Sequence, residues 1–203
     1  MVEITRENLT QFNNEGFFVA KGLLDPEIDL GPIKAEYKEV LDNAVSDLQA
    51  RGIIKNNYME LPFEKRISQV LEESDGELNK YLDITLPQKD INSQTPMHCG
   101  PAAFNLIRNS KLLDAVEQFI GSEIYSNPTQ HVRIKPPAHY LAGTTRVLSE
   151  IDTTVWHQDA GTGTSDADHT NTLTVWISVT EASKENGCLM VAPKSHRKGL
   201  ALH

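Results

Sequence analysis

The chain has little cysteine and no dense cluster of positive charge. Its two cysteines, Cys99 and Cys188, cannot build a disulfide framework, and no Cys-x-x-Cys pair is present to suggest structural zinc. The 19 lysines and arginines stand against 28 aspartates and glutamates, which gives a net charge of −9. Without a basic stripe to neutralise phosphates, the sequence argues against nucleic acid as a partner.

Long apolar runs are also missing. No stretch approaches the length of apolar sequence that crosses a bilayer, and the first residues do not have the basic region and apolar core of a secretory signal. We therefore expect a cytoplasmic protein with no membrane partner. The length of 203 residues and the hydrophobic fraction of 39% are enough for a sizeable core, so we expect residues 1–203 to form a single domain.

The first part of the chain, residues 1–123, has the periodicity of helices. After Ile33 the apolar residues recur three and four positions apart, as on the buried face of a helix, and Gly52 provides a stop. Shorter helices are expected before Gly16, over residues 63–71, and from Ser110, as the N-cap, to Gly121.

The second part, residues 124–203, alternates apolar and polar residues as strands do. In residues 172–180 the alternation is clean, and Asn186-Gly187 is a strong turn signal. Further strands are expected at residues 131–135, 145–148, 153–159 and 188–192. Several short strands joined by turns predict a barrel or jelly roll. The expected fold class is therefore mainly β with a helical N-terminal layer.

The tripeptide His157-Gln158-Asp159 carries the clearest chemical signal. Residues two apart in an extended strand project from the same face, so His157 and Asp159 would present an imidazole and a carboxylate side by side. These are two of the three ligands in the 2-His-1-carboxylate triad of non-haem Fe(II) sites. Alone, such a pair is more often a strand histidine bonded to a carboxylate.

Several blocks of sequence share an order and a spacing that resemble the phytanoyl-CoA dioxygenase family. The blocks are Phe12-Asn13-Asn14-Glu15-Gly16-Phe17-Phe18-Val19, Lys135-Pro136-Pro137, Trp156-His157-Gln158-Asp159, the strand around Trp176, Glu185-Asn186-Gly187-Cys188-Leu189 and Pro193-Lys194-Ser195-His196-Arg197-Lys198-Gly199. The resemblance extends over nearly the whole chain, and its specific motifs lie between about residue 132 and residue 199.

The resemblance implies a double-stranded β-helix, a jelly roll of the cupin type, behind the helical layer. Its members use Fe(II), 2-oxoglutarate and O₂, and most hydroxylate a small molecule with release of succinate and CO₂. His157 and Asp159 match the first two iron ligands. Trp176 matches a tryptophan of the 2-oxoglutarate pocket, and His131 and Gln158 are assigned to the same co-substrate.

The chain departs from the family at two places. Lys194 stands where the family often has the glycine of Pro-Gly-Ser-His. The family's second iron-binding histidine and its 2-oxoglutarate-binding arginine come later than His203, the last residue. The resemblance thus implies a member without its closing strands. If these 203 residues are the whole protein, we expect a homodimer that completes the barrel or a poorly soluble chain, because unpaired strand edges promote pairing. His196 and His203 match a loop, and neither is expected to bind iron.

Three functions stay open. One is an Fe(II)- and 2-oxoglutarate-dependent dioxygenase acting on a small molecule. Another is a truncated or degenerate member that binds a small molecule or a protein without catalysis. The third is a cupin-like metal enzyme that does not use 2-oxoglutarate. Succinate release separates the first from the third.

Overall fold

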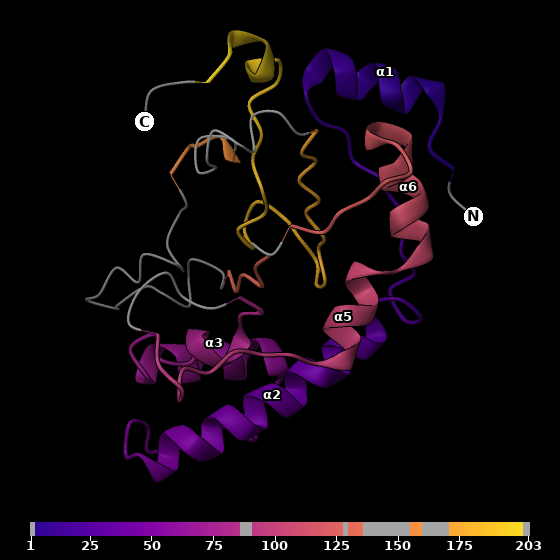
Figure 1. Cartoon of the computed structure of the whole chain (residues 1–203). Coiled ribbons are helices and arrows are strands. Elements are labelled where there is room, and N and C mark those ends of the chain that lie inside the picture. Colours follow the sequence, from indigo (N-terminus) through magenta and orange to yellow (C-terminus); the bar gives the residue numbers. More distant parts are fainter. Residues whose placement is uncertain (1–2, 86–90, 128–129, 136–154, 160–170, 201–203) are drawn as a thin grey trace.

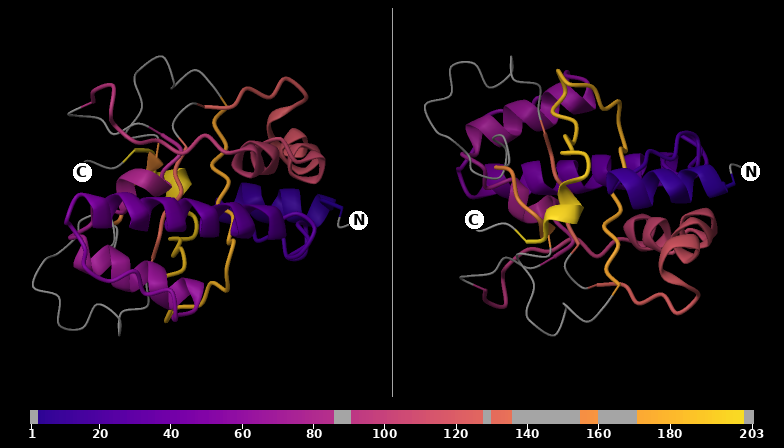
Figure 2. Two further views of the ribbon diagram at one scale, coloured as in Figure 1. Left: turned by 90° about the horizontal axis from the view of Figure 1, so that it is seen from below. Right: turned by 90° about the horizontal axis from the view of Figure 1, so that it is seen from above.

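The computed structural model describes residues 3–85, 91–127, 130–135, 155–159 and 171–200. Their regular structure consists of α1 (Arg6–Glu15), α2 (Gly31–Ala50), α3 (Phe63–Glu73), α4 (Asn79–Leu82), α5 (Pro101–Ile107), α6 (Ser110–Ile120) and the 3-10 helix η4 (Ser195–Lys198). In Figure 1 the α-helices follow the right and lower edges of the molecule as a curved helical layer, and the later described segments run beside this layer, which Figure 2 shows from below and above. The four helices expected from the sequence are confirmed as α1, α2, α3 and α6.

Helix α2 lies at the centre of the core. Pro32 occupies its first turn, where a missing N–H breaks no helical hydrogen bond. Its apolar side chains recur at helical spacing and are buried, namely Ile33, Tyr37, Leu41, Ala44, Val45 and Leu48. Helices α3, α4 and α5 pack against α2. Leu41 and Leu48 have no exposed surface, and the burial of each contributes about 2 kcal/mol to folding.

Helix α1 is fixed to α6 by aromatic rings. Thr5 begins α1 with a capping box, and Gly16 ends it in the left-handed conformation at a φ of 85°. The ring of Phe119 on α6 contacts Phe12 and Phe18, with ring centroids 4.8 Å and 5.2 Å apart. The C-terminal end of α1 therefore has a defined position on the helical layer.

The start of α6 differs from the expectation by one residue. Asn109, not Ser110, is the N-cap, and its side-chain oxygen accepts hydrogen bonds from the N–H groups of Lys111 and Leu112. The Asn109 amide also donates to Asp29 over 2.9 Å, and the Lys111 ammonium bonds the same carboxylate at 2.5 Å. The hydrogen bond from Lys111, then those from the backbone N–H of Asp25 and from Asn109, lower the pKa of Asp29 to about 2.

The expected fold class is wrong for the part of the chain that the structure describes. Residues 3–85, 91–127, 130–135, 155–159 and 171–200 contain no β-strand, so no double-stranded β-helix or jelly roll is present in them. Residues 145–148, one of the expected strands, lie outside the described residues. Residues 130–135 and 171–180 run without the hydrogen-bonded ladder that defines a sheet.

The alternating pattern of these two segments has another physical cause. Val132 and Ile134 of the first segment, and Ile177 and Val179 of the second, pack against the helical core. Alternation shows that one side of an irregular segment is buried, and it does not require that a neighbouring strand is present. The segments are therefore layered on helices, and their polar side faces away from the core.

None of the helices within the described ranges is long and apolar enough to span a membrane.

Candidate functional site

The structure brings His157 and Asp159 together. His157 Nε2 lies 3.3 Å from Asp159 Oδ1, and the two side chains are 43% and 57% exposed. The segment that carries them, residues 155–159, contains no strand, so their approach does not depend on the alternation of a sheet. Both groups are open to solvent, and a small ligand can reach them.

The ring of His157 is held by its other nitrogen. Nδ1 lies 2.8 Å from the carbonyl oxygen of Val155. A carbonyl oxygen only accepts, so Nδ1 carries the proton and donates it. Nε2 on the other side of the ring faces Asp159. A backbone carbonyl on the far nitrogen is the usual support of a metal-binding histidine.

Asp159 is oriented by Thr174. The Thr174 hydroxyl donates to Asp159 Oδ2 over 2.7 Å, so this oxygen is engaged while Oδ1 faces His157. Thr174 is not among the site residues expected from the sequence. A signal was nevertheless present, because Thr174 lies two positions before Trp176 on the polar side of residues 172–180.

Gln158 bonds away from the pair. Its side-chain amide donates to the carbonyl oxygen of Gly199 over 3.1 Å. The segment that contains the two candidate ligands is thus tied to the loop of residues 193–199. Its expected contact with a co-substrate stays a prediction.

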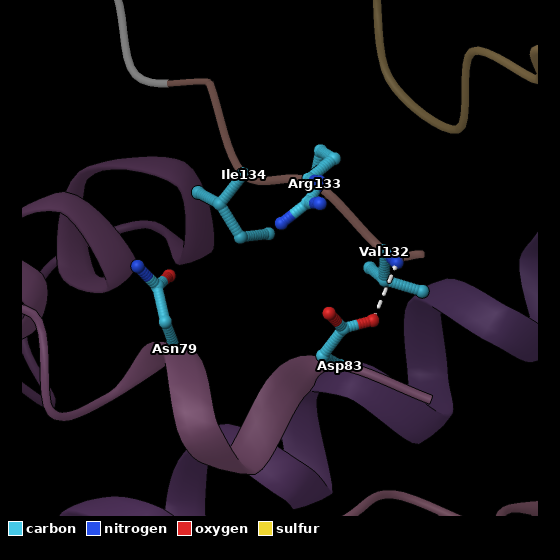
Figure 3. Close-up of a pocket in the computed structure, with 5 residues that line it drawn as sticks. All are labelled: Asn79, Asp83, Val132, Arg133 and Ile134. Atoms are coloured by element: carbon cyan, nitrogen blue, oxygen red, sulfur yellow. Dashed lines mark hydrogen bonds between the residues drawn. The ribbon is translucent and has the colours of Figure 1, made fainter. Parts of the chain in front are cut away.

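His131 lies against the helical layer. Its Nδ1 is 2.9 Å from Asp83 Oδ2, and the other oxygen of Asp83 accepts from the N–H of Val132. Asp83 follows α4 and lines a surface hollow with Asn79, Val132, Arg133 and Ile134 (Figure 3). The lining of this hollow includes neither His157 nor Asp159. Trp176 is about half exposed. The assignments of His131 and Trp176 to 2-oxoglutarate stay predictions.

A second pair of titratable groups lies inside the helical layer. His98 Nε2 is 2.9 Å from Glu36 Oε1, and the N–H groups of Ala102 and Ala103 donate to the same carboxylate over 2.7 Å and 3.0 Å. Burial raises the pKa of Glu36, but the hydrogen bonds from His98 and the two backbone groups outweigh it and lower the pKa. This carboxylate joins α2 to the start of α5, so the pair has a structural role.

The geometry of His157 and Asp159 fits two neighbouring ligands of one metal ion. Ligand atoms at right angles around an octahedral ion, each about 2.1 Å from it, lie about 3 Å apart. The observed separation of 3.3 Å is close to that value. The carboxylate of Asp159 is also a ligand type that favours a cation. Among the residues that the structure describes, no third histidine, cysteine or acidic side chain joins the pair in a group that could hold a metal ion.

Comparison with known proteins identifies the family. A family model of phytanoyl-CoA dioxygenase matches residues 12–203. The chain belongs to the phytanoyl-CoA dioxygenase family. Comparison with curated proteins finds no match, and comparison with solved structures finds none either.

The match to the phytanoyl-CoA dioxygenase family contains every residue of the candidate site. His157, Asp159, Thr174 and the loop of residues 193–199 all lie within residues 12–203. Membership confirms the resemblance that the sequence motifs carry. It indicates an oxidoreductase of the dioxygenase type.

Proposed function

We propose that this chain is an Fe(II)- and 2-oxoglutarate-dependent dioxygenase that hydroxylates a small molecule. His157 and Asp159 are two of its iron ligands in this proposal. Family membership supports the reaction class, and the position of the two side chains supports the ligand assignment. The observation that carries the proposal is the orientation of His157, whose Nδ1 is engaged by a backbone carbonyl while Nε2 faces a carboxylate.

The protein groups have separable tasks. Val155 fixes the tautomer of His157 through its carbonyl oxygen, and Thr174 fixes the rotamer of Asp159 through its hydroxyl. When bound, Fe(II) would supply the oxidising chemistry in which one oxygen atom of O₂ converts a substrate C–H into C–OH and the other converts 2-oxoglutarate into succinate and CO₂. The open faces of His157 and Asp159 leave room for the co-substrate and for the small molecule to be hydroxylated.

An anaerobic titration with Fe(II) and 2-oxoglutarate tests the proposal. The wild-type chain is expected to develop the visible metal-to-ligand charge-transfer band of chelated 2-oxoglutarate, and Asp159→Ala is expected to lose it. Asp114→Ala is the matched control, because Asp114 is an exposed residue of α6 outside the site. A band of equal strength in wild type and Asp159→Ala would refute the ligand assignment.

The Thr174 hydroxyl provides a more graded test. Thr174→Val keeps the shape of the side chain and removes the hydrogen bond to Asp159. Loss of such a supporting contact typically weakens metal binding by about 10- to 100-fold. Thr180→Val is the control, since Thr180 is exposed in the same segment. Equal Fe(II) affinities of the two variants would remove Thr174 from the site.

The second candidate is a non-catalytic family member that binds a small molecule or a protein. The observation in its favour is that the pair has no third ligand group around it within the described ranges. A folded sample that forms no charge-transfer band and releases no succinate from 2-oxoglutarate would select this candidate. Succinate release that requires Asp159 would select the dioxygenase.

A further inference from the structure

We propose that residues 193–199, the docking loop, position the candidate iron ligands by fastening their segment to the C-terminal end of α1. His196 and Arg197 are positioning residues in this proposal, and Gln158 is the link. The effect on metal binding rests on the proposed function. The fastening itself is a property of the chain that can be measured without metal.

The docking loop supplies hydrogen-bond donors to the end of α1. The last carbonyl groups of a helix have no partner within it and carry partial negative charge. His196 Nε2 and Arg197 Nη2 lie 3.2 Å and 3.3 Å from the carbonyl oxygen of Asn13. The backbone N–H of Lys194 donates to the carbonyl oxygen of Glu15 over 2.8 Å. Arg197 also donates to the Asn14 side chain over 3.0 Å.

Gly16 makes room for the docking loop. A Cβ atom on Gly16 would lie 2.5 Å from Nδ1 of His196 and 3.0 Å from its Cγ. The imidazole therefore lies directly on the backbone of the residue that ends α1. Figures 1 and 2 show η4, which contains His196 and Arg197, beside this end of α1. The fit is specific to a glycine at position 16.

The docking loop reaches the candidate ligands through Gly199. Its carbonyl oxygen accepts the hydrogen bond from Gln158, the residue between His157 and Asp159. Those two side chains are largely open to solvent, so burial contributes little to their position. Asp159 accepts a hydrogen bond from Thr174, and Gln158 donates one to Gly199, which connects this segment through the docking loop to α1.

Hydrogen–deuterium exchange of the metal-free chain tests the fastening. The double variant His196→Ala with Arg197→Ala removes both side chains that bond to Asn13. We expect the peptide that contains residues 155–159 to exchange about tenfold faster, as loss of bonds of ordinary strength allows. Exchange in α2 should not change. Lys198→Ala is the control, because it removes a cation from the same 3-10 helix.

A second variant breaks the other end of the link. Gln158→Leu removes the bond to Gly199 and leaves the docking loop on α1. This variant should speed the exchange of residues 155–159 to a similar extent. Combining it with the double variant should speed the exchange little further. Unchanged exchange in both variants would overturn the proposal. Equal acceleration in α2 would also overturn it, because the loop would then support only overall stability.

Binding of Mn(II) to the same variants separates the two proposals. If the proposed function holds, loosening by the double variant should weaken Mn(II) binding about tenfold, and Lys198→Ala should bind like wild type. A wild-type chain that binds no divalent metal would defeat the ligand assignment, while the exchange experiment would still decide the fastening. Loosened exchange with unchanged Mn(II) affinity would overturn the positioning role.

Discussion

In the helical layer, Leu41, Leu48 and Val70 have no exposed surface, whereas His157 and Asp159 are largely exposed. The first region is held by apolar side chains packed around α2. The segment with the candidate ligands is held by single hydrogen bonds, such as those from Thr174 and to Val155. Buried apolar surface stabilises a region more than a few exposed hydrogen bonds do.

Stability and chemistry lie in different parts of this chain. The helical layer provides a fixed support, and the candidate site is attached to it at separate points. Apolar side chains such as Ile177 attach one segment to the core, and the docking loop attaches another to α1. Substitutions in the layer should therefore change the free energy of unfolding, and substitutions in the segments should change local order and ligand binding.

The largest effect is expected from a cavity in the layer. Leu41→Ala should lower the free energy of unfolding by about 2–5 kcal/mol, because Leu41 has no exposed surface and its neighbours are fixed in helices. Leu200→Ala is the matched control, since this leucine is 61% exposed, and its effect should stay within about 0.5 kcal/mol. Urea denaturation measures both. Equal decreases in the free energy of unfolding would show that the helical layer and the exposed segment are stabilised to the same extent.

A smaller effect should come from crowding the polar contact between α2 and α5. A Cβ atom at Gly100 would lie 2.3 Å from Glu36 and equally close to His98. Gly100→Ala should therefore destabilise the chain by about 1–3 kcal/mol. Gly31→Ala is the control, because a Cβ there meets nothing within 4 Å. Thermal unfolding of both variants measures the difference, and similar melting temperatures would mean that the contact yields easily.

The same contact should give the helical layer a dependence on acid. The pKa of Glu36 is lowered in the folded chain, so its contribution is complete above its ordinary value of 4.5 and is lost as the pH falls through the folded value. Between pH 7 and pH 3 the wild type should lose about 1 kcal/mol more stability than Glu36→Gln. Glu39→Gln, an exposed change on the same helix, should follow the wild type. If the free energy of unfolding changed with pH equally in the wild type and in Glu36→Gln, this expectation would be wrong.

The helices could be predicted where the signal is local. The apolar spacing after Ile33 lies within α2, and Gly16 and Gly121 directly follow α1 and α6. Signals of this local kind predict α1, α2, α3 and α6 from the sequence. Helices α4 and α5 have only four and seven residues, which is too short to show a period. Asn109 caps α6 in place of Ser110, and both residue types are favoured at an N-cap, so the local sequence does not choose between them.

Only those site residues that are close to one another in the sequence could be predicted. His157 and Asp159 lie two residues apart, and motif and structure agree that they are close in space. The wrong fold class arose because alternation shows burial on one side without naming the partner, which here is the helical core behind Ile177 and Val179. The bond of Thr174 to Asp159 depends on tertiary structure, which no local pattern contains.

The smallest effect is expected at Lys194, in the docking loop. This residue has a φ of 65°, in the left-handed region that favours glycine, and the related motif often has glycine there. Lys194→Gly should raise the free energy of unfolding by about 0.5–1 kcal/mol, because relief of this strain exceeds the loss of an exposed ion pair with Glu15. Lys198→Gly removes the same side chain from η4, where φ is not positive, and should be destabilising. Urea denaturation distinguishes the two signs. Destabilisation by both variants would mean that the Lys194 side chain contributes more to the docking loop than its backbone strain costs.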